Sequence, residues 1–410
     1  MFEKIKNSTS IRYFEYSAYL LTASFFLGHA ALSVCYVIFL LTSFKSVIKN
    51  FSLKEFLSNK ALIFPCIFFI FNLIIVIILG DSPNDVLKTE KILCLLIFPI
   101  IFFSTKEHFQ GPKSLFFNIK KTFVLTAFFT FSISFAYGLY RVFYAENALN
   151  SIYITYDHLA DLFGVQPLYL AVFYLMAVIF SIDISKSKPR QRNKYFIISG
   201  ILVCGIVLLS SRTGLLLSLI VLIVIGSKIK SKINNKTVFS VSLLFLILCL
   251  ILTFSIPTLK NRVLKLNENI SSYSGLSFRT KIWKNTIFVF QESSLFGYGL
   301  YLSQDKLMNQ YIKTNFRRGY IYNLNTHNQY LQTLLDTGLI GLIILIFMLV
   351  YPIRDIKNTP ITELLFTVII LVSLIPESFF LRQYGVLSYS FFSCVFQVSR
   401  KKLAPKIKLS

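Results

Sequence analysis

The polar stretch NTHNQYLQTLLDTGLIG, which begins at Asn325, leads directly into a long apolar run. Thr326 is of a type that caps helix N-termini, so we expect His327 and Asn328 in the first turn of the following helix. A neutral imidazole in that position can take a proton from a substrate hydroxyl. The alternative is a histidine at a membrane interface that meets only water or a backbone carbonyl. The two glycines near the end of the stretch favour close helix packing over chemistry.

Two arginines occupy polar, turn-like settings between apolar runs. Arg212 lies in SSRTG, and Arg279 lies in SFRTKIW, four residues before Trp283. Guanidinium groups stay charged and bind phosphate oxygens in pairs, so two of them suit a diphosphate group. The alternative for each is an arginine that only extends its side chain to the membrane interface.

A third polar patch, YITYDHLADLFG, precedes another apolar run. Four of its side chains make up what we call the Tyr156 patch: Tyr156, Asp157, His158 and Asp161. Such a cluster can hold a sugar through hydroxyl contacts and aromatic stacking, or orient a catalytic group. The alternative is an interfacial aromatic belt with ordinary loop charges.

Two further joints receive no catalytic role. Gly297 and Gly299 in FGYG are predicted to be turn glycines, and Glu377 and Arg382 in PESFFLRQ are predicted to form a surface ion pair.

The sequence contains no recognisable set of metal or nucleotide ligands. Its four histidines are scattered, and its six cysteines lie inside apolar runs without a CxxC pair. Phosphate-binding glycine loops, the GxSxG nucleophile motif and DxD-type pairs are missing as well. We therefore expect neither a metal nor a cofactor, and the energy for any reaction must come from the substrate or from a gradient.

Composition defines the class of protein that carries these residues. The chain has 410 residues, of which 55% are hydrophobic and 15% charged, whereas soluble domains carry about 25% charged residues. The composition predicts an all-α, polytopic membrane protein. The net charge of +24 does not indicate a nucleic-acid partner, because most of it follows the membrane topology described next.

Apolar windows of spanning length predict about twelve transmembrane helices. They cover residues 14–28, 30–44, 61–79, 92–104, 122–140, 167–184, 196–210, 213–227, 237–256, 331–353, 361–376 and 384–398. Lys and Arg gather in alternate joints, which places those joints and both termini in the cytoplasm. The short outer joints hold only Lys88, Lys91, Arg141, Arg212 and Arg382.

The map divides the chain into four parts. Residues 1–256 form helices one to nine, 257–328 form a large periplasmic loop, 329–398 form helices ten to twelve, and 399–410 form a basic cytoplasmic tail. The loop has apolar runs of its own. We expect it to fold as a cap, with a short amphipathic helix near Ile282 lying against the membrane.

The stretch that starts at His327, with HN, nine residues and then GLIG, resembles the signature of the O-antigen ligase and polysaccharide polymerase superfamily. Arg212 after the seventh helix and Arg279 early in the long loop match the positions where that superfamily carries its arginines. The twelve-helix map and the single large outer loop agree with the resemblance, which extends over most of the chain.

The resemblance implies an inverting, metal-independent glycosyltransferase of the GT-C kind in the bacterial inner membrane, with its active site on the periplasmic face. The donor would be a glycan on undecaprenyl pyrophosphate, and in the ligase branch the acceptor would be a sugar of lipid A-core. His327 would be the base, and Arg212 and Arg279 would hold the pyrophosphate. Asn328 and the Tyr156 patch are candidates for glycan or acceptor contacts.

The chemistry of such a transfer agrees with these residue types. A pyrophosphate leaving group needs cations for its developing charge, and the acceptor hydroxyl needs one base. A glycosidase would instead show two opposed carboxylates. The nearest alternative is a polymerase of the same superfamily. A lipid-linked sugar flippase would require ionisable residues and broken helices at mid-membrane, and the predicted helices contain few charges at depth.

Overall fold

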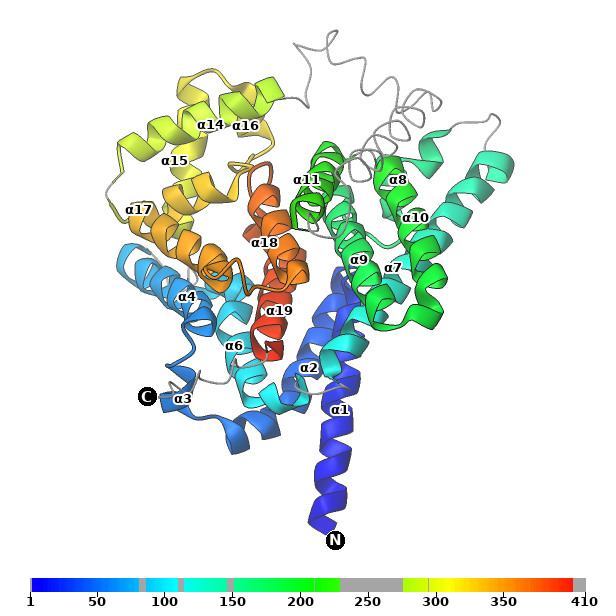
Figure 1. Cartoon of the computed structure of the whole chain (residues 1–410). Coiled ribbons are helices and arrows are strands. Elements are labelled where there is room, and N and C mark those ends of the chain that lie inside the picture. The colour runs from blue at the N-terminus through cyan, green and yellow to red at the C-terminus, as the bar shows by residue number, and fades with distance from the viewer. Residues whose placement is uncertain are drawn as a thin grey trace.

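The computed structural model describes residues 2–80, 86–109, 114–145, 151–209, 211–228, 276–293 and 295–400. Throughout these ranges the chain is built of helices joined by short turns (Figure 1). The all-α class is therefore confirmed.

The helices of the first part follow the predicted apolar runs closely. They are α1 (Phe2–Ser24), α2 (His29–Asn50), α3 (Leu53–Phe56), α4 (Lys60–Leu79), η1 (Lys88–Ile92), α6 (Cys94–Ser104), η2 (Lys106–Phe109), α7 (Leu115–Tyr140), η3 (Arg141–Ala145), η4 (Ser151–Ile154), α8 (Tyr156–Asp161), α9 (Pro167–Ser187), η5 (Pro189–Gln191), α10 (Arg192–Leu208) and α11 (Arg212–Lys228). Proline at the first position of α9 suits a helix start, because that position has no helical hydrogen bond to lose.

The remaining helices form the outer region and the end of the chain. They are α14 (Leu276–Gln291), α15 (Gly299–Lys313), α16 (Arg317–Ile321), α17 (Gln329–Val350), η6 (Tyr351–Ile353), α18 (Ile361–Ser373), η7 (Phe379–Leu381) and α19 (Gln383–Ser399).

Every predicted membrane helix except the ninth coincides with a helix of the structure; the ninth, 237–256, lies outside the described residues. Within the described ranges, five helices are long and apolar enough to cross a membrane. They are His29–Asn50, Lys60–Leu79, Leu115–Tyr144, Pro167–Ser187 and Gln329–Ile353. The protein is thus a helical membrane protein, while the number of twelve spans and their orientation stay predictions.

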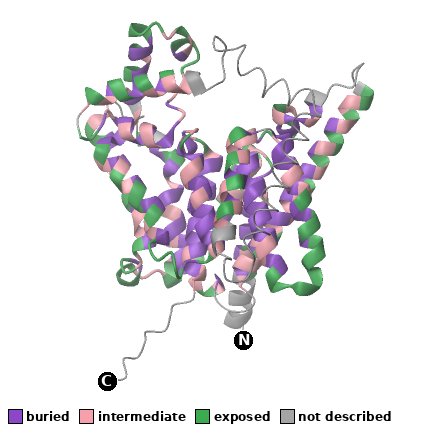
Figure 2. Cartoon of the chain, turned by 45° about the horizontal axis from the view of Figure 1, so that its top comes forward, coloured by how far each residue is buried: buried purple, intermediate pink, exposed green. Residues whose placement is uncertain are grey.

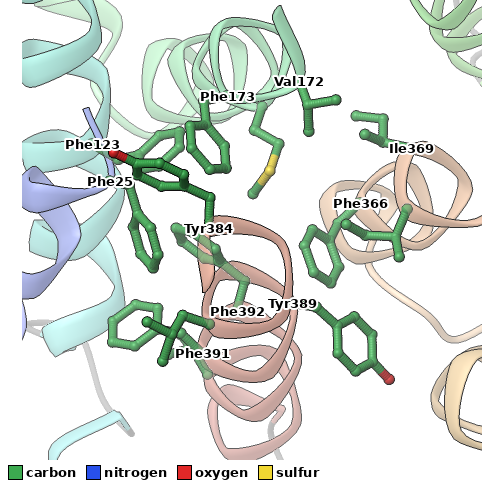
Figure 3. Packing of buried hydrophobic residues seen from close by; sticks show 14 of the residues in the cluster. Phe25, Phe123, Val172, Phe173, Phe366, Ile369, Tyr384, Tyr389, Phe391 and Phe392 are labelled. Carbon is green, nitrogen blue, oxygen red and sulfur yellow. The ribbon is translucent and has the colours of Figure 1, made fainter. Parts of the chain in front are cut away.

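The core of the bundle is formed around α9 and α19, which are buried on nearly all sides (Figure 2). Aromatic rings from α1, α7 and α18 converge on α19 (Figure 3). The rings of Phe123 and Phe392 lie 5.1 Å apart, and those of Phe366 and Phe392 lie 6.2 Å apart. Such tilted and edge-on pairs match the preferred geometry of aromatic packing.

Helices α14, α15 and α16 form a small cap with a hydrophobic cluster of its own, at the end of the molecule opposite the start of α1 (Figure 1). The predicted amphipathic helix near Ile282 exists as α14, and its expected position against the membrane stays a prediction. Ile282 and Val289 are buried in a cluster with Leu307 of α15 and Leu335 of α17. Another part of the apolar surface of α14, at Ile287 and Phe288, is exposed.

Helix α17 is broken at Gly338, where φ is 67° and ψ is −165°. The break leaves the carbonyl of Leu335 to accept a hydrogen bond from the backbone of Tyr298, at 3.0 Å. Gly297, with φ of 72°, sits so close that a β-carbon on it would come within 2.7 Å of the same carbonyl oxygen. Gly338 therefore breaks the helix and also packs closely against the backbone of Leu295 and Gly297. Gly297 allows the segment before α15 to contact α17 at that break.

We expect Gly338→Ala to destabilise the protein severely. Alanine at positive φ costs about 1–2 kcal/mol, and its β-carbon would approach the carbonyl oxygen of Leu295 to 2.0 Å. Gly200→Ala in α10 is the matched control, because a β-carbon there meets nothing within 4 Å and alanine favours helix. In thermal unfolding in detergent, the melting temperature should fall strongly for Gly338→Ala and stay near the wild-type value for Gly200→Ala. A wild-type melting temperature for Gly338→Ala would contradict the proposed strain.

Candidate active site

His327 lies in the loop just before α17 and has a left-handed backbone, with φ of 46°. The helix starts at Gln329, and its N-cap is Asn328, whose side chain accepts a hydrogen bond from the backbone of Leu331 at 3.1 Å. The expectation that Thr326 caps the helix and that His327 lies in the first turn is therefore wrong. The reason is that the Thr326 hydroxyl is engaged elsewhere, as described next.

The loop that carries His327 is held from two sides. The indole N–H of Trp283 in α14 donates to the backbone carbonyl of Thr326 at 3.1 Å. The hydroxyl of Thr326, which is fully buried, lies 3.0 Å from Oε1 of Gln332 and 3.1 Å from the hydroxyl of Ser378. Asn325 accepts a hydrogen bond from the backbone of His327 at 3.0 Å. These contacts fix the strained backbone from which the imidazole projects.

Glu377 lies next to this imidazole. Its Oε2 is 3.5 Å from Nδ1 of His327, and the two side chains are 13% and 29% exposed. The prediction of a surface ion pair missed this contact, because Glu377 faces His327, 50 residues away in sequence, and is largely buried. No spacing signal in the sequence links the two residues.

Arg279 approaches the same place from the cap. It precedes Trp283 by four residues, so both side chains lie on one face of α14, and Trp283 contacts the loop before His327. Burial lowers the pKa of Arg279, and the charge of Arg212 lowers it further, whereas Glu377 and Tyr156 raise it. A guanidinium remains protonated under these conditions. The effects of these charges on its pKa place Arg212, Glu377 and Tyr156 in the neighbourhood of Arg279.

Arg212 is the first residue of α11 and is exposed. The hydroxyl of Ser211 accepts a hydrogen bond from the backbone of Gly214 at 3.2 Å, which is the geometry of a helix N-cap. The N-terminus of a helix presents free backbone N–H groups and the positive end of the helix dipole. Arg212 thus adds its charge to a position that already favours an anion.

The Tyr156 patch is divided by the structure. Tyr156 begins α8 with a left-handed backbone, φ of 48°. It lies close enough to Arg279 to raise the pKa of that guanidinium. His158 and Asp161 pair with each other along α8, with Nδ1 and Oδ2 3.5 Å apart. The glycan contacts predicted for Asp157, His158 and Asp161 stay predictions, as does the one for Asn328, whose side chain caps α17.

The arrangement as a whole combines two cations, a helix N-terminus and a histidine–carboxylate pair. Such a site can bind a phosphorylated group beside a base. Among the residues that the structure describes, no three His, Cys, Asp or Glu side chains are grouped to hold a metal ion.

Residues 197–346 match the family model described as O-antigen ligase. This match supports the resemblance to the O-antigen ligase and polymerase superfamily. The matched segment contains Arg212, Arg279 and His327, whereas Tyr156 and Glu377 lie outside it. A search of curated proteins found no match. The match indicates a glycosyltransferase of the ligase or polymerase type.

Proposed function

We propose that the protein is an O-antigen ligase of the bacterial inner membrane, with its active site on the periplasmic face. It would transfer a glycan from undecaprenyl pyrophosphate to a sugar hydroxyl of lipid A-core. The observation that carries this proposal is the convergence of Arg212 and Arg279 with the His327–Glu377 pair. The match to the O-antigen ligase family supports the choice of substrates.

The arginines would bind the pyrophosphate of the donor. Arg279 is partly buried and is positioned by α14, while Arg212 stands at the N-terminus of α11. Two like charges near each other are unfavourable until an anion compensates them, so the two arginines favour binding of a dianionic headgroup. When the sugar–phosphate bond breaks, the electron pair goes to the pyrophosphate, and the arginines stabilise its growing charge.

The His327–Glu377 pair would activate the acceptor. From its position 3.5 Å from Nδ1, Glu377 would accept a hydrogen bond from Nδ1–H, which would leave Nε2 unprotonated and able to take the proton of the acceptor hydroxyl. The oxygen then attacks the anomeric carbon from the side opposite the pyrophosphate, so the configuration inverts. The proton stays on His327, where the carboxylate of Glu377 stabilises the imidazolium. No metal or cofactor takes part in this scheme.

Two alternatives use the same fold. A polymerase of the superfamily would need the same cations and base, but with a second lipid-linked repeat as acceptor. A flippase gains some support from the break in α17 and from Asp336, a buried carboxylate next to it. However, Asp336 is hydrogen-bonded to Ser303 and Gln332 within the protein, and the His327–Glu377 pair lies in loops rather than inside the membrane helices.

The function is tested with purified protein in detergent, lipid-linked glycan as donor and lipid A-core as acceptor. We expect glycan-bearing lipid A-core as product, with equal yield when EDTA is present. In cells, deletion of the gene should cause polymeric lipid-linked glycan to accumulate. Accumulation of single repeat units would indicate a polymerase, and normal surface glycan in the deletion strain would exclude both enzymes.

A further inference from the structure

A chain of buried polar side chains runs from the membrane helix α17 to the loops on which His327 and Glu377 lie. We call it the Asp336 network; it consists of Ser303, Thr326, Gln332, Asp336 and Ser378. All five residues are buried, and Asp336 is 4% exposed. Buried polar groups are costly unless each is hydrogen-bonded, so the network needs a structural or functional reason.

The carboxylate of Asp336 determines which groups of the network donate hydrogen bonds and which accept them. Asp336 accepts from the hydroxyl of Ser303 and from Nε2 of Gln332, which lies 3.0 and 3.2 Å from its two oxygens. A carboxylate is only an acceptor, so it forces the amide of Gln332 to present its NH₂ group. The amide oxygen of Gln332 then points to Thr326, whose hydroxyl is 3.0 Å away.

The far end of the network connects the two loops of the active site. Thr326 precedes His327, and Ser378 follows Glu377. The hydroxyls of Thr326 and Ser378 are 3.1 Å apart, and Ser378 also accepts from the backbone of Asn328 at 3.3 Å. Because these loops come from separate parts of the chain, this contact sets the distance between the imidazole and the carboxylate.

The near end reaches the cap. Ser303 belongs to α15, which packs with α14 in the cap cluster. Helix α14 carries Arg279, and its Trp283 bonds to the same Thr326 residue. The cap is thus attached to the active-site loop twice, once through Trp283 and once through Asp336.

A small, mostly apolar cavity of about 40 Å³ lies against Asp336 on the side of α4 and η1. Asn72 and Lys91 line it together with Gln329 and Thr333. Its size is sufficient for a few water molecules, and Lys91 brings a positive charge to the lining of the same cavity.

We propose that Asp336 is a positioning residue: through Gln332 and Thr326 it aligns His327 with Glu377, and through Ser303 it couples that alignment to the seating of the cap. The inference rests on the proposed function, because it assumes that the aligned pair carries the base. Asp336 itself contacts neither substrate.

The main test is Thr326→Val, which removes one hydroxyl and keeps the side-chain shape. We expect kcat to fall at least about 10-fold while the KM for the lipid-linked donor changes less than about twofold. Thr326→Ser, which keeps the hydroxyl, should restore most of kcat. Thr22→Val is the matched control, because its buried hydroxyl donates to Ala18 within α1, and its kcat should stay normal.

A second readout separates positioning from general stability. Trp283 is the chain's single tryptophan, so intrinsic fluorescence reports its contact with Thr326 directly. Asp336→Asn and Ser303→Ala should shift its emission to longer wavelength and lower kcat, whereas Thr22→Val should do neither. In Thr326→Val, the kcat–pH profile should differ from that of the wild type, because the carboxylate of Glu377 is no longer aligned with the imidazole.

The outcomes distinguish the two proposals. If the wild-type protein transfers no glycan, the proposed function fails, whatever the fluorescence shows. If the wild type is active and Thr326→Val has normal kcat and a normal pH profile, the positioning role is refuted. If Asp336→Asn does not fold, Thr326→Val and Ser303→Ala still decide the question.

Discussion

Replacing Arg212 or Arg279 by alanine should strongly reduce glycan transfer, although both variants should still insert and fold. Each arginine is expected to make charge-assisted contacts to the donor pyrophosphate, and losing one such contact costs roughly 1.5–3 kcal/mol, or about 10- to 150-fold. We expect the larger effect for Arg279, because it is partly buried and Glu377 would lose a neighbouring cation. The measurement is transfer by purified protein over a range of donor concentrations.

Lysine should restore only part of the activity, because it keeps the charge but not the two-pronged geometry of the guanidinium. Arg141→Ala is the control: this arginine packs over the ring of Tyr153, 4.0 Å from its centre, and has no part in the proposed site. Normal transfer by both Arg212→Ala and Arg279→Ala would show that the pyrophosphate binds elsewhere.

The helices of this protein could be predicted from the sequence because composition alone is sufficient to identify a membrane helix. A run of about 20 apolar residues is sufficient, and α4 and α9 coincide with their predicted ranges to within a few residues. The packing of a helix against its neighbours could not be predicted in the same way. The apolar residues of α14 predicted an amphipathic helix, but the burial of Ile282 by α15 and α17 is revealed by no local pattern.

The sequence predicted individual residues of the candidate site but not the contacts between them. Arg212, Arg279 and His327 stood out by residue type and by their setting between apolar runs. Glu377 did not, because its partner His327 is 50 residues away and the contact depends on how two loops meet. The N-cap of α17 was misplaced for a related reason. Thr326 and Asn328 are both good caps, and only the tertiary contacts of Thr326 with Gln332 and Ser378 decide between them.

Two residues of the candidate site have strained backbone conformations, which the sequence does not show. His327 and Tyr156 both adopt left-handed backbones, which residues other than glycine rarely do. Such strain persists only where the surroundings enforce it. For His327 the enforcing contacts are visible in Asn325, Trp283 and the Asp336 network. A histidine that merely rested at a membrane interface would not need them.

The second large effect is expected for the His327–Glu377 pair. General-base catalysis contributes about 10²- to 10⁴-fold to a rate, so His327→Ala should lose that much transfer at saturating donor. Binding of the lipid-linked donor should persist, because the arginines hold its headgroup. Glu377→Gln should lose activity by a smaller factor, since the amide keeps a hydrogen-bond acceptor for Nδ1–H but not the charge that stabilises the imidazolium. His108→Ala, remote from the site in η2, is the control.

The pH dependence of the same assay separates a base from a residue that only positions the acceptor. Protonation of an imidazole removes the base, so wild-type transfer should fall at acid pH. His327→Gln can replace a hydrogen bond but cannot accept the proton, and the activity that remains should lose this acid limb. Near-normal turnover by His327→Gln, or an acid limb that survives in it, would assign the proton to another group and leave His327 with a positioning role.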